Sequence, residues 1–195
     1  MEELPKRKPH RLQGYDYSKN GYYFLTICTD KRKPILSNVG RGLAPAANSV
    51  VLSGIGKIAE EQLFVLETKY PFLKIDRYVI MPNHIHVIFA LNGKTAGASP
   101  RPTVMDIVCA YKFQTTRICN KEDNIPGRKI FQTSFYDEII RNQTAYDEIS
   151  KYIFENPMNW ELDELFIINI KRGFLQFLAY IVYVRQIFEK GGGRK

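Results

Sequence analysis

The chain has 195 residues, of which 45% are hydrophobic and 13% aromatic, so it is long enough for one domain with a substantial core and too short for two comfortable ones. This composition excludes a disordered protein, because disordered chains are poor in these residue types. The formal net charge of +8 favours an anionic partner, with nucleic acid first and a membrane surface second. A basic surface that serves only solubility is the alternative.

The cysteines and the apolar segments indicate the cellular compartment. Cys28, Cys109 and Cys119 form no CxxC pair and are odd in number, which argues against a disulfide scaffold or a zinc ribbon. The N-terminus lacks the apolar core of a secretory signal. Polar residues interrupt the apolar stretch 174–188, which is shorter than the ~20 residues of a spanning helix. We therefore expect a cytoplasmic protein without a membrane span.

Hydrophobic periodicity predicts alternating strands and helices. Residues 37–48 and 92–103 are rich in glycine, proline and small residues and are predicted to be loops. The predicted elements are, in chain order, a strand at 22–29, a helix at 53–68 capped by Ser53, strands at 75–81 and 84–91, a helix at 104–119, a strand or extended segment at 131–140 and a helix at 144–156. This order predicts an α+β fold, with a ferredoxin-like or RRM-like antiparallel sheet and helices packed against it.

We expect one domain over residues 1–165, followed by a C-terminal tail, residues 166–195, to which the sequence assigns no structure. Residues 1–20 form a basic N-terminal arm ahead of the first predicted strand. A flexible basic arm can bind DNA phosphates or enter a groove, and the alternative is a solvated tail. The candidate DNA-binding cations in the arm are Lys6, Arg7, Lys8 and Arg11.

Two of the three histidines lie one residue apart in the apolar segment Tyr78–Val87. Because residues two apart in a strand point to the same face of a sheet, His84 and His86 converge while Ile85 and Val87 face the other side. Two neutral imidazoles placed in this way can chelate a divalent ion. The alternative is a pair of buried histidines satisfied by neighbouring side chains.

The predicted helix 144–156 carries a second candidate pair. Tyr152 and Asn156 are four residues apart, which places a phenol and an amide oxygen about 40° apart on one helix face. Tyr152 lies at the edge of the apolar stripe of this helix, and a tyrosine at such an edge commonly buries its ring and leaves its hydroxyl in water. The neighbouring apolar stripe consists of Tyr146, Ile149, Ile153 and Trp160.

Three sequence blocks carry a family resemblance. They are Pro82–Val87, Ser134–Asn142 and Tyr152–Trp160, and their order and rough spacing agree with the family pattern. Over about residues 9–165 the chain resembles the HUH-type single-tyrosine transposases of bacterial insertion sequences, and most closely their REP-associated tyrosine transposase branch. Arg141 and Asn142 fall inside the second block, although an asparagine in this position is also an ordinary helix cap.

The resemblance implies the chemistry of the site. Tyr152 would be the nucleophile that attacks single-stranded DNA, leaving a 5′-phosphotyrosine and a free 3′-hydroxyl. His84 and His86 would bind a divalent ion, Mg²⁺ or Mn²⁺, and Asn156 matches the position of a third metal ligand. The covalent intermediate conserves the bond energy, so no ATP is required. The family binds DNA hairpins, and a homodimer in the nucleoid is compatible with the resemblance.

Two other functions use the same features. A non-catalytic module could bind a nucleic-acid hairpin on the same fold without cutting it. A structural metal-binding protein would need the histidines alone. Neither alternative requires Tyr152, His84, His86 and Asn156 together, and the sequence therefore favours the transposase.

Overall fold

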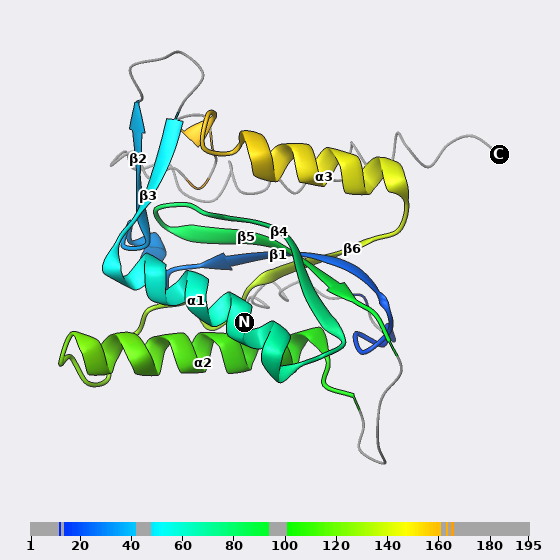
Figure 1. The fold of residues 1–195 in the computed structure, drawn as a ribbon, viewed down its shortest axis with the longest axis horizontal. Helices are drawn as coiled ribbons and strands as arrows, with labels where there is room; N and C mark the ends of the chain where they lie inside the picture. Colours follow the sequence, from blue (N-terminus) through cyan, green and yellow to red (C-terminus); the bar gives the residue numbers. More distant parts are fainter. Residues whose placement is uncertain are drawn as a thin grey trace, which may run out of the picture.

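A four-stranded antiparallel sheet forms the centre of the molecule in the computed structural model, which describes residues 12, 14–41, 48–93, 101–160, 163 and 165 (Figure 1). The strand order is β4-β5-β1-β6. The strands are β1 (Gly21–Cys28), β4 (Leu73–Ile80), β5 (His84–Leu91) and β6 (Tyr136–Ile140). With helices α1 and α2 in the two crossovers, this order is that of a ferredoxin-like sheet. The predicted α+β class is confirmed.

The helices cover both faces of the sheet. Helices α1 (Gly54–Lys69) and α2 (Val104–Glu122) lie together on one face, and α3 (Gln143–Glu155) lies on the other (Figure 1). A short turn containing η1 (Asp30–Arg32) follows β1. Within the described part of the chain, no helix is long and apolar enough to cross a membrane.

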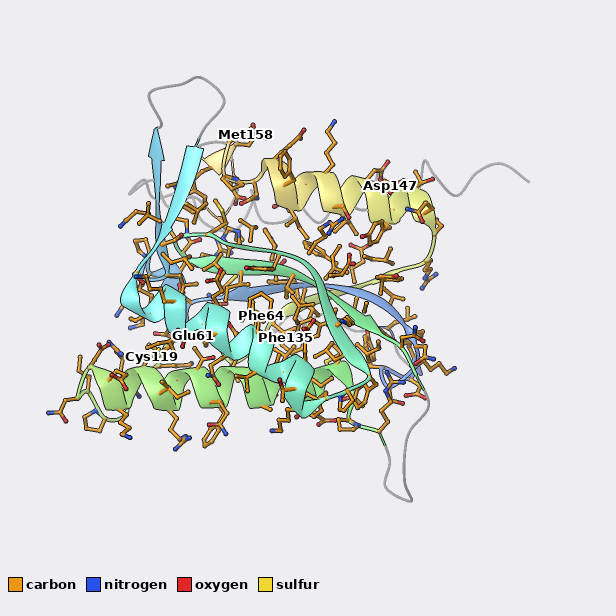
Figure 2. All side chains as sticks on the ribbon, viewed as in Figure 1. Glu61, Phe64, Cys119, Phe135, Asp147 and Met158 are labelled. Carbon is orange, nitrogen blue, oxygen red and sulfur yellow. The ribbon has the colours of Figure 1, made fainter. Side chains whose placement is uncertain are left out.

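Alternation along the two central strands divides the core into two parts. Tyr23, Leu25 and Ile27 of β1 join the larger cluster beneath α1 and α2, whereas Phe24 joins the smaller cluster beneath α3. Side chains fill the space between the sheet and the helices on each side (Figure 2). The smaller cluster consists of Phe24, Ile88, Ile140, Ala145, Ile149 and Ile153. Because both faces of β1 and β5 are largely buried, these strands are mostly apolar, and their buried polar side chains are Thr26, His84 and His86.

The predicted helix caps are present. The Ser53 hydroxyl oxygen accepts a hydrogen bond from the Gly56 amide at 3.0 Å, as predicted. Asn142 caps α3, since its side-chain oxygen accepts from the Ala145 amide at 2.8 Å. This contact accounts for Asn142 as a structural residue of the second sequence block.

The structure corrects one sequence prediction and gives the exact bounds of another. Residues 37–48 were predicted to be a loop, but Ser37–Arg41 forms β2 and pairs with β3 (Asn48–Leu52) in a two-stranded sheet. The β2 sequence lacks apolar alternation, and long-range contacts hold its base: the Ser37 hydroxyl donates to the Ile80 carbonyl at 2.8 Å. The strand or extended segment predicted at 131–140 forms a regular strand over β6, and Phe131 ahead of it makes an isolated bridge to Thr29.

Candidate metal and tyrosine site

The two histidines lie on the α3 face of the sheet, as the strand pattern predicts. Strand β5 begins at His84, and β1 pairs with it so that Thr26 faces His86 and Cys28 faces His84. The two imidazole rings are 4.4 Å apart between centroids, and both are fully buried. The sequence prediction that these rings converge is confirmed.

Asn83 determines which nitrogen of His84 is protonated. The Asn83 amide nitrogen donates to the Leu165 carbonyl at 2.6 Å, so the Asn83 amide oxygen is the group that lies 2.8 Å from Nδ1 of His84. His84 Nδ1 must then be the donor, which leaves Nε2 with a lone pair. This Nε2 is buried and has no hydrogen-bond partner among the described residues. A buried polar atom without a partner is costly, and a bound cation would satisfy it.

His86 is held from two sides. Its Nδ1 lies 2.9 Å from the Thr26 hydroxyl and its Nε2 lies 3.1 Å from the Tyr152 hydroxyl. When Nδ1–H donates to Thr26, Nε2 accepts a hydrogen bond from the Tyr152 phenol. The Phe24 ring stacks on His86 with centroids 5.3 Å apart, which fixes the plane of the imidazole.

Burial keeps both imidazoles neutral. Desolvation lowers the pKa of His84 to about 3, and the positive charge of Arg32 lowers it further in the same direction. Desolvation also lowers the pKa of His86 well below its usual value; His84 adds to this effect and Asp163 opposes it. Neutral imidazole is the form that binds metals, so both side chains are competent ligands at neutral pH.

Asp163 brings a carboxylate oxygen to the histidines, and Asn156 is hydrogen-bonded to Asp163. Asn156, the residue that ends α3, is 3% exposed, and its amide nitrogen donates to a carboxylate oxygen of Asp163 at 2.7 Å. The Asn156 amide oxygen is buried without a hydrogen-bond partner in the described part of the chain. Ligand atoms of His84, His86 and Asp163 all lie within 4.8 Å of one another.

Sequence reasoning missed Asp163. The signal was the acidic stretch 161–164, which does not indicate which carboxylate turns toward the histidines. The fold decides this, because Leu165 accepts a hydrogen bond from Asn83, and the Leu165 amide in turn donates to Asp163 at 2.6 Å. Two imidazole nitrogens with carboxylate and amide oxygens suit a divalent ion such as Mn²⁺, Mg²⁺ or Zn²⁺.

Tyr152 lies beside the histidines. Its ring centroid is 5.1 Å from that of His86 and 6.3 Å from that of Phe24. Tyr152 thus contacts His86 and Asn156 contacts Asp163, while their helical spacing predicts only that they share one face of the helix. The four predicted cations of the arm, Lys6, Arg7, Lys8 and Arg11, lie outside the described residues, as does the tail from residue 166 onward.

The chain was compared with known protein families, sequences and solved structures. No protein family model matches the chain. An uncharacterized protein of Haemophilus influenzae is 27% identical over 176 residues, which cover 83% of this chain and 93% of that protein. A solved structure of a REP-associated tyrosine transposase bound to a REP hairpin superposes with a TM-score of 0.55 at 19% identity, covering 79% of this chain and 76% of the other.

A second solved structure, a candidate transposase from Deinococcus radiodurans R1, is 18% identical, covers 74% of this chain and 95% of that chain, and superposes with a TM-score of 0.43. The superposition with the hairpin-bound structure shows that the chain has the α+β fold of a REP-associated tyrosine transposase, with the four-stranded antiparallel sheet and three helices described above. It also has a group of side chains that can hold a metal ion.

Proposed function

We propose that this protein is a transposase: a metal-dependent endonuclease and strand-transferase that binds DNA hairpins and cuts single-stranded DNA through Tyr152. The observation that carries the proposal is the 3.1 Å contact between the Tyr152 hydroxyl and Nε2 of His86, a residue of the candidate metal group. A nucleophile and ligands for a cation beside one another are the two components that phosphodiester cleavage requires.

The cleavage step is a phosphoryl transfer to tyrosine. The Tyr152 oxygen attacks the phosphorus, the bond from phosphorus to the 3′ oxygen breaks, and a 5′-phosphotyrosine forms. The proton lost by the phenol is balanced by the proton gained by the leaving 3′ oxygen. Attack by a 3′-hydroxyl on the phosphotyrosine reverses the step and joins strands, so neither ATP nor a redox partner is needed.

His84, His86 and Asp163 would hold the ion, with the amide oxygen of Asn156 as a further ligand. Bound there, a Mg²⁺ or Mn²⁺ ion would polarise the phosphate and stabilise charge on the leaving oxygen. Two atoms support this assignment: Nε2 of His84 and the amide oxygen of Asn156 are both buried without hydrogen-bond partners among the described residues. Asn83 and Thr26 would orient the two imidazoles through their Nδ1 atoms.

Two observations support DNA as the partner: the positive net charge of this chain and the hairpin bound to the structural neighbour. The net charge of +8 supplies the attraction for phosphates that nucleic-acid binding requires. The neighbour with the same fold is bound to a REP hairpin. We assign the N-terminal cations Lys6, Arg7, Lys8 and Arg11 to the DNA phosphates, and place the protein in the cytoplasm with the nucleoid, as a monomer or a homodimer.

A covalent adduct assay tests the proposal. The protein is incubated with an end-labelled single-stranded DNA hairpin and Mn²⁺ or Mg²⁺, and denaturing gels resolve protein–DNA adducts. Wild type should form an adduct, and Tyr152→Phe should lose it while retaining hairpin binding. The matched control is Tyr146→Phe, which removes a phenol from the same helix, where it is hydrogen-bonded to Asp76, and should leave the adduct intact. Hairpin binding without any adduct across several substrates would favour the non-catalytic binding module.

A further inference from the structure

The Tyr152 hydroxyl contacts Nε2 of His86, the ring nitrogen through which His86 would bind a metal ion. The other ring nitrogen, Nδ1, faces the Thr26 hydroxyl at 2.9 Å. Only Nε2 is left to point toward the rest of the site, and it lies 3.1 Å from the Tyr152 hydroxyl. In the tautomer in which Nδ1–H donates to Thr26, this nitrogen has one lone pair, which cannot accept a hydrogen bond and bind a cation at the same time.

The two histidines therefore differ. Among the described residues, the buried Nε2 of His84 has no hydrogen-bond partner, whereas Nε2 of His86 contacts the Tyr152 phenol. The rest of the cation site is in place. Asn83 is hydrogen-bonded to both His84 and the Leu165 carbonyl, and the Leu165 amide donates to Asp163. The structure thus places His84 and Asp163 in position to bind a cation, while the Tyr152 phenol occupies the His86 nitrogen that would complete the site.

We infer that the Tyr152 phenol and the metal ion are alternative occupants of His86 Nε2, so that loading the site with metal releases the nucleophile. This inference rests on the proposed function. In the metal-free protein the phenol is restrained on His86. When Nε2 turns to a cation, the phenol no longer has His86 as its acceptor, and its hydroxyl can turn toward a phosphate. Tyrosine release and metal binding are then one linked equilibrium.

Linkage predicts an unusual effect of removing the nucleophile. Tyr152→Phe retains the ring that packs near Phe24 and His86 but leaves Nε2 of His86 buried without a partner. Metal binding no longer has to break a hydrogen bond, so Mn²⁺ should bind about three- to tenfold more tightly to the variant than to wild type, the range expected for one net hydrogen bond. Isothermal titration of the DNA-free protein with Mn²⁺ measures this ratio.

Tyr146→Phe is the matched control for the titration. It deletes a phenol from the same helix, one that donates to Asp76 at 2.6 Å instead of to a histidine. Its Mn²⁺ affinity should equal that of wild type. Equal affinities for wild type and Tyr152→Phe would overturn the inference. Weaker binding by Tyr152→Phe would also overturn it, because the phenol would then be a metal ligand and not a competitor.

Nitrogen NMR supplies a readout that does not depend on affinity. The chain has only three histidines, so labelling histidine with ¹⁵N gives few signals. In the metal-free protein, the Nε2 resonance of His86 should differ between wild type and Tyr152→Phe, since only wild type donates a hydrogen bond to it. With saturating Mg²⁺ or Zn²⁺ the two proteins should converge, and a difference that persists would contradict alternative occupancy.

The outcomes separate this inference from the proposed function. If the metal effects appear but no DNA adduct forms, the coupling stands and the endonuclease proposal fails. If adducts form and Tyr152→Phe has unchanged metal affinity, the endonuclease stands and the coupling fails. Absence of metal binding by both proteins would overturn the coupling.

Discussion

The side chain of Asn83 accepts a hydrogen bond from Nδ1 of His84 at 2.8 Å and donates one to the carbonyl of Leu165 at 2.6 Å. One buried amide therefore orients a proposed metal ligand and also fastens the segment that carries Asp163. The two atoms of the amide have different roles: the oxygen sets the tautomer of His84, and the nitrogen binds the Leu165 segment.

Replacing Asn83 should weaken both metal binding and the fold. Asn83→Ala removes both hydrogen bonds, and loss of a group that orients a metal-binding histidine typically costs about 10- to 100-fold in affinity. The buried His84 Nδ1 is left without its partner, which should also lower the free energy of unfolding by about 1–3 kcal/mol. Titration with Mn²⁺ and urea unfolding measure the two effects.

Asn83→Asp distinguishes the two ends of the amide. The carboxylate still accepts from His84 but cannot donate to Leu165, so the His84 tautomer should persist in ¹⁵N NMR spectra while the Leu165 contact is lost. A histidine spectrum identical to that of Asn83→Ala would contradict the role assigned to the amide oxygen.

Glu138 should make stability depend on pH. Burial on the α3 side of β6 raises the pKa of this carboxyl to about 7, and the nearby positive charge of Arg141 opposes the shift only in part. The folded state therefore binds more protons than the unfolded state between pH 4.5 and 7, and unfolding free energy from this group falls as pH rises through that window.

Glu138→Gln tests this pH dependence. The variant should gain stability over wild type above pH 7, by about 1 kcal/mol after allowance for the partial exposure of the group, and little at pH 4.5. Urea unfolding at several pH values measures the difference. Glu148→Gln, which neutralises an exposed carboxylate on α3, is the control and should follow wild type throughout. If the free energies of unfolding of Glu138→Gln and wild type differ by the same amount at every pH, the raised pKa of Glu138 is refuted.

Helix α3 should depend on a small apolar contact with the sheet. Ile149 is 6% exposed and packs in the cluster of Phe24, Ile88 and Ile140. Ile149→Ala should lower the free energy of unfolding by about 2–4 kcal/mol, because it removes buried methyl groups and leaves a cavity. Phe154→Ala is the control on the same helix, where the side chain is 77% exposed, and should change stability by less than about 0.5 kcal/mol. Thermal and urea unfolding report both.

Much of the site could be read from local patterns. The two-residue spacing of His84 and His86 predicts a shared face, and the four-residue spacing of Tyr152 and Asn156 predicts a shared helix side. Both predictions are confirmed, because strand and helix periodicities are properties of neighbouring residues. Ser53 as the cap of α1 was predictable for the same reason.

The features that the sequence did not predict depend on contacts between residues far apart in the chain. Asp163 reaches the histidines only because Leu165 binds Asn83, a contact that spans 82 residues. The β2–β3 pair formed where loop composition predicted none, since Ser37 bonds to Ile80 across 43 residues. Neither contact leaves a periodic signal in the sequence.

Sequence by itself determined the strand that presents two imidazoles and the helix that presents a phenol, because hydrophobic periodicity specifies which way each side chain points. Only the tertiary structure decided what those groups meet: Thr26 and Tyr152 on His86, Asn83 on His84, and Asp163 beside both. The physical reason is that strand register and helix placement set these distances, and both are products of packing the whole sheet.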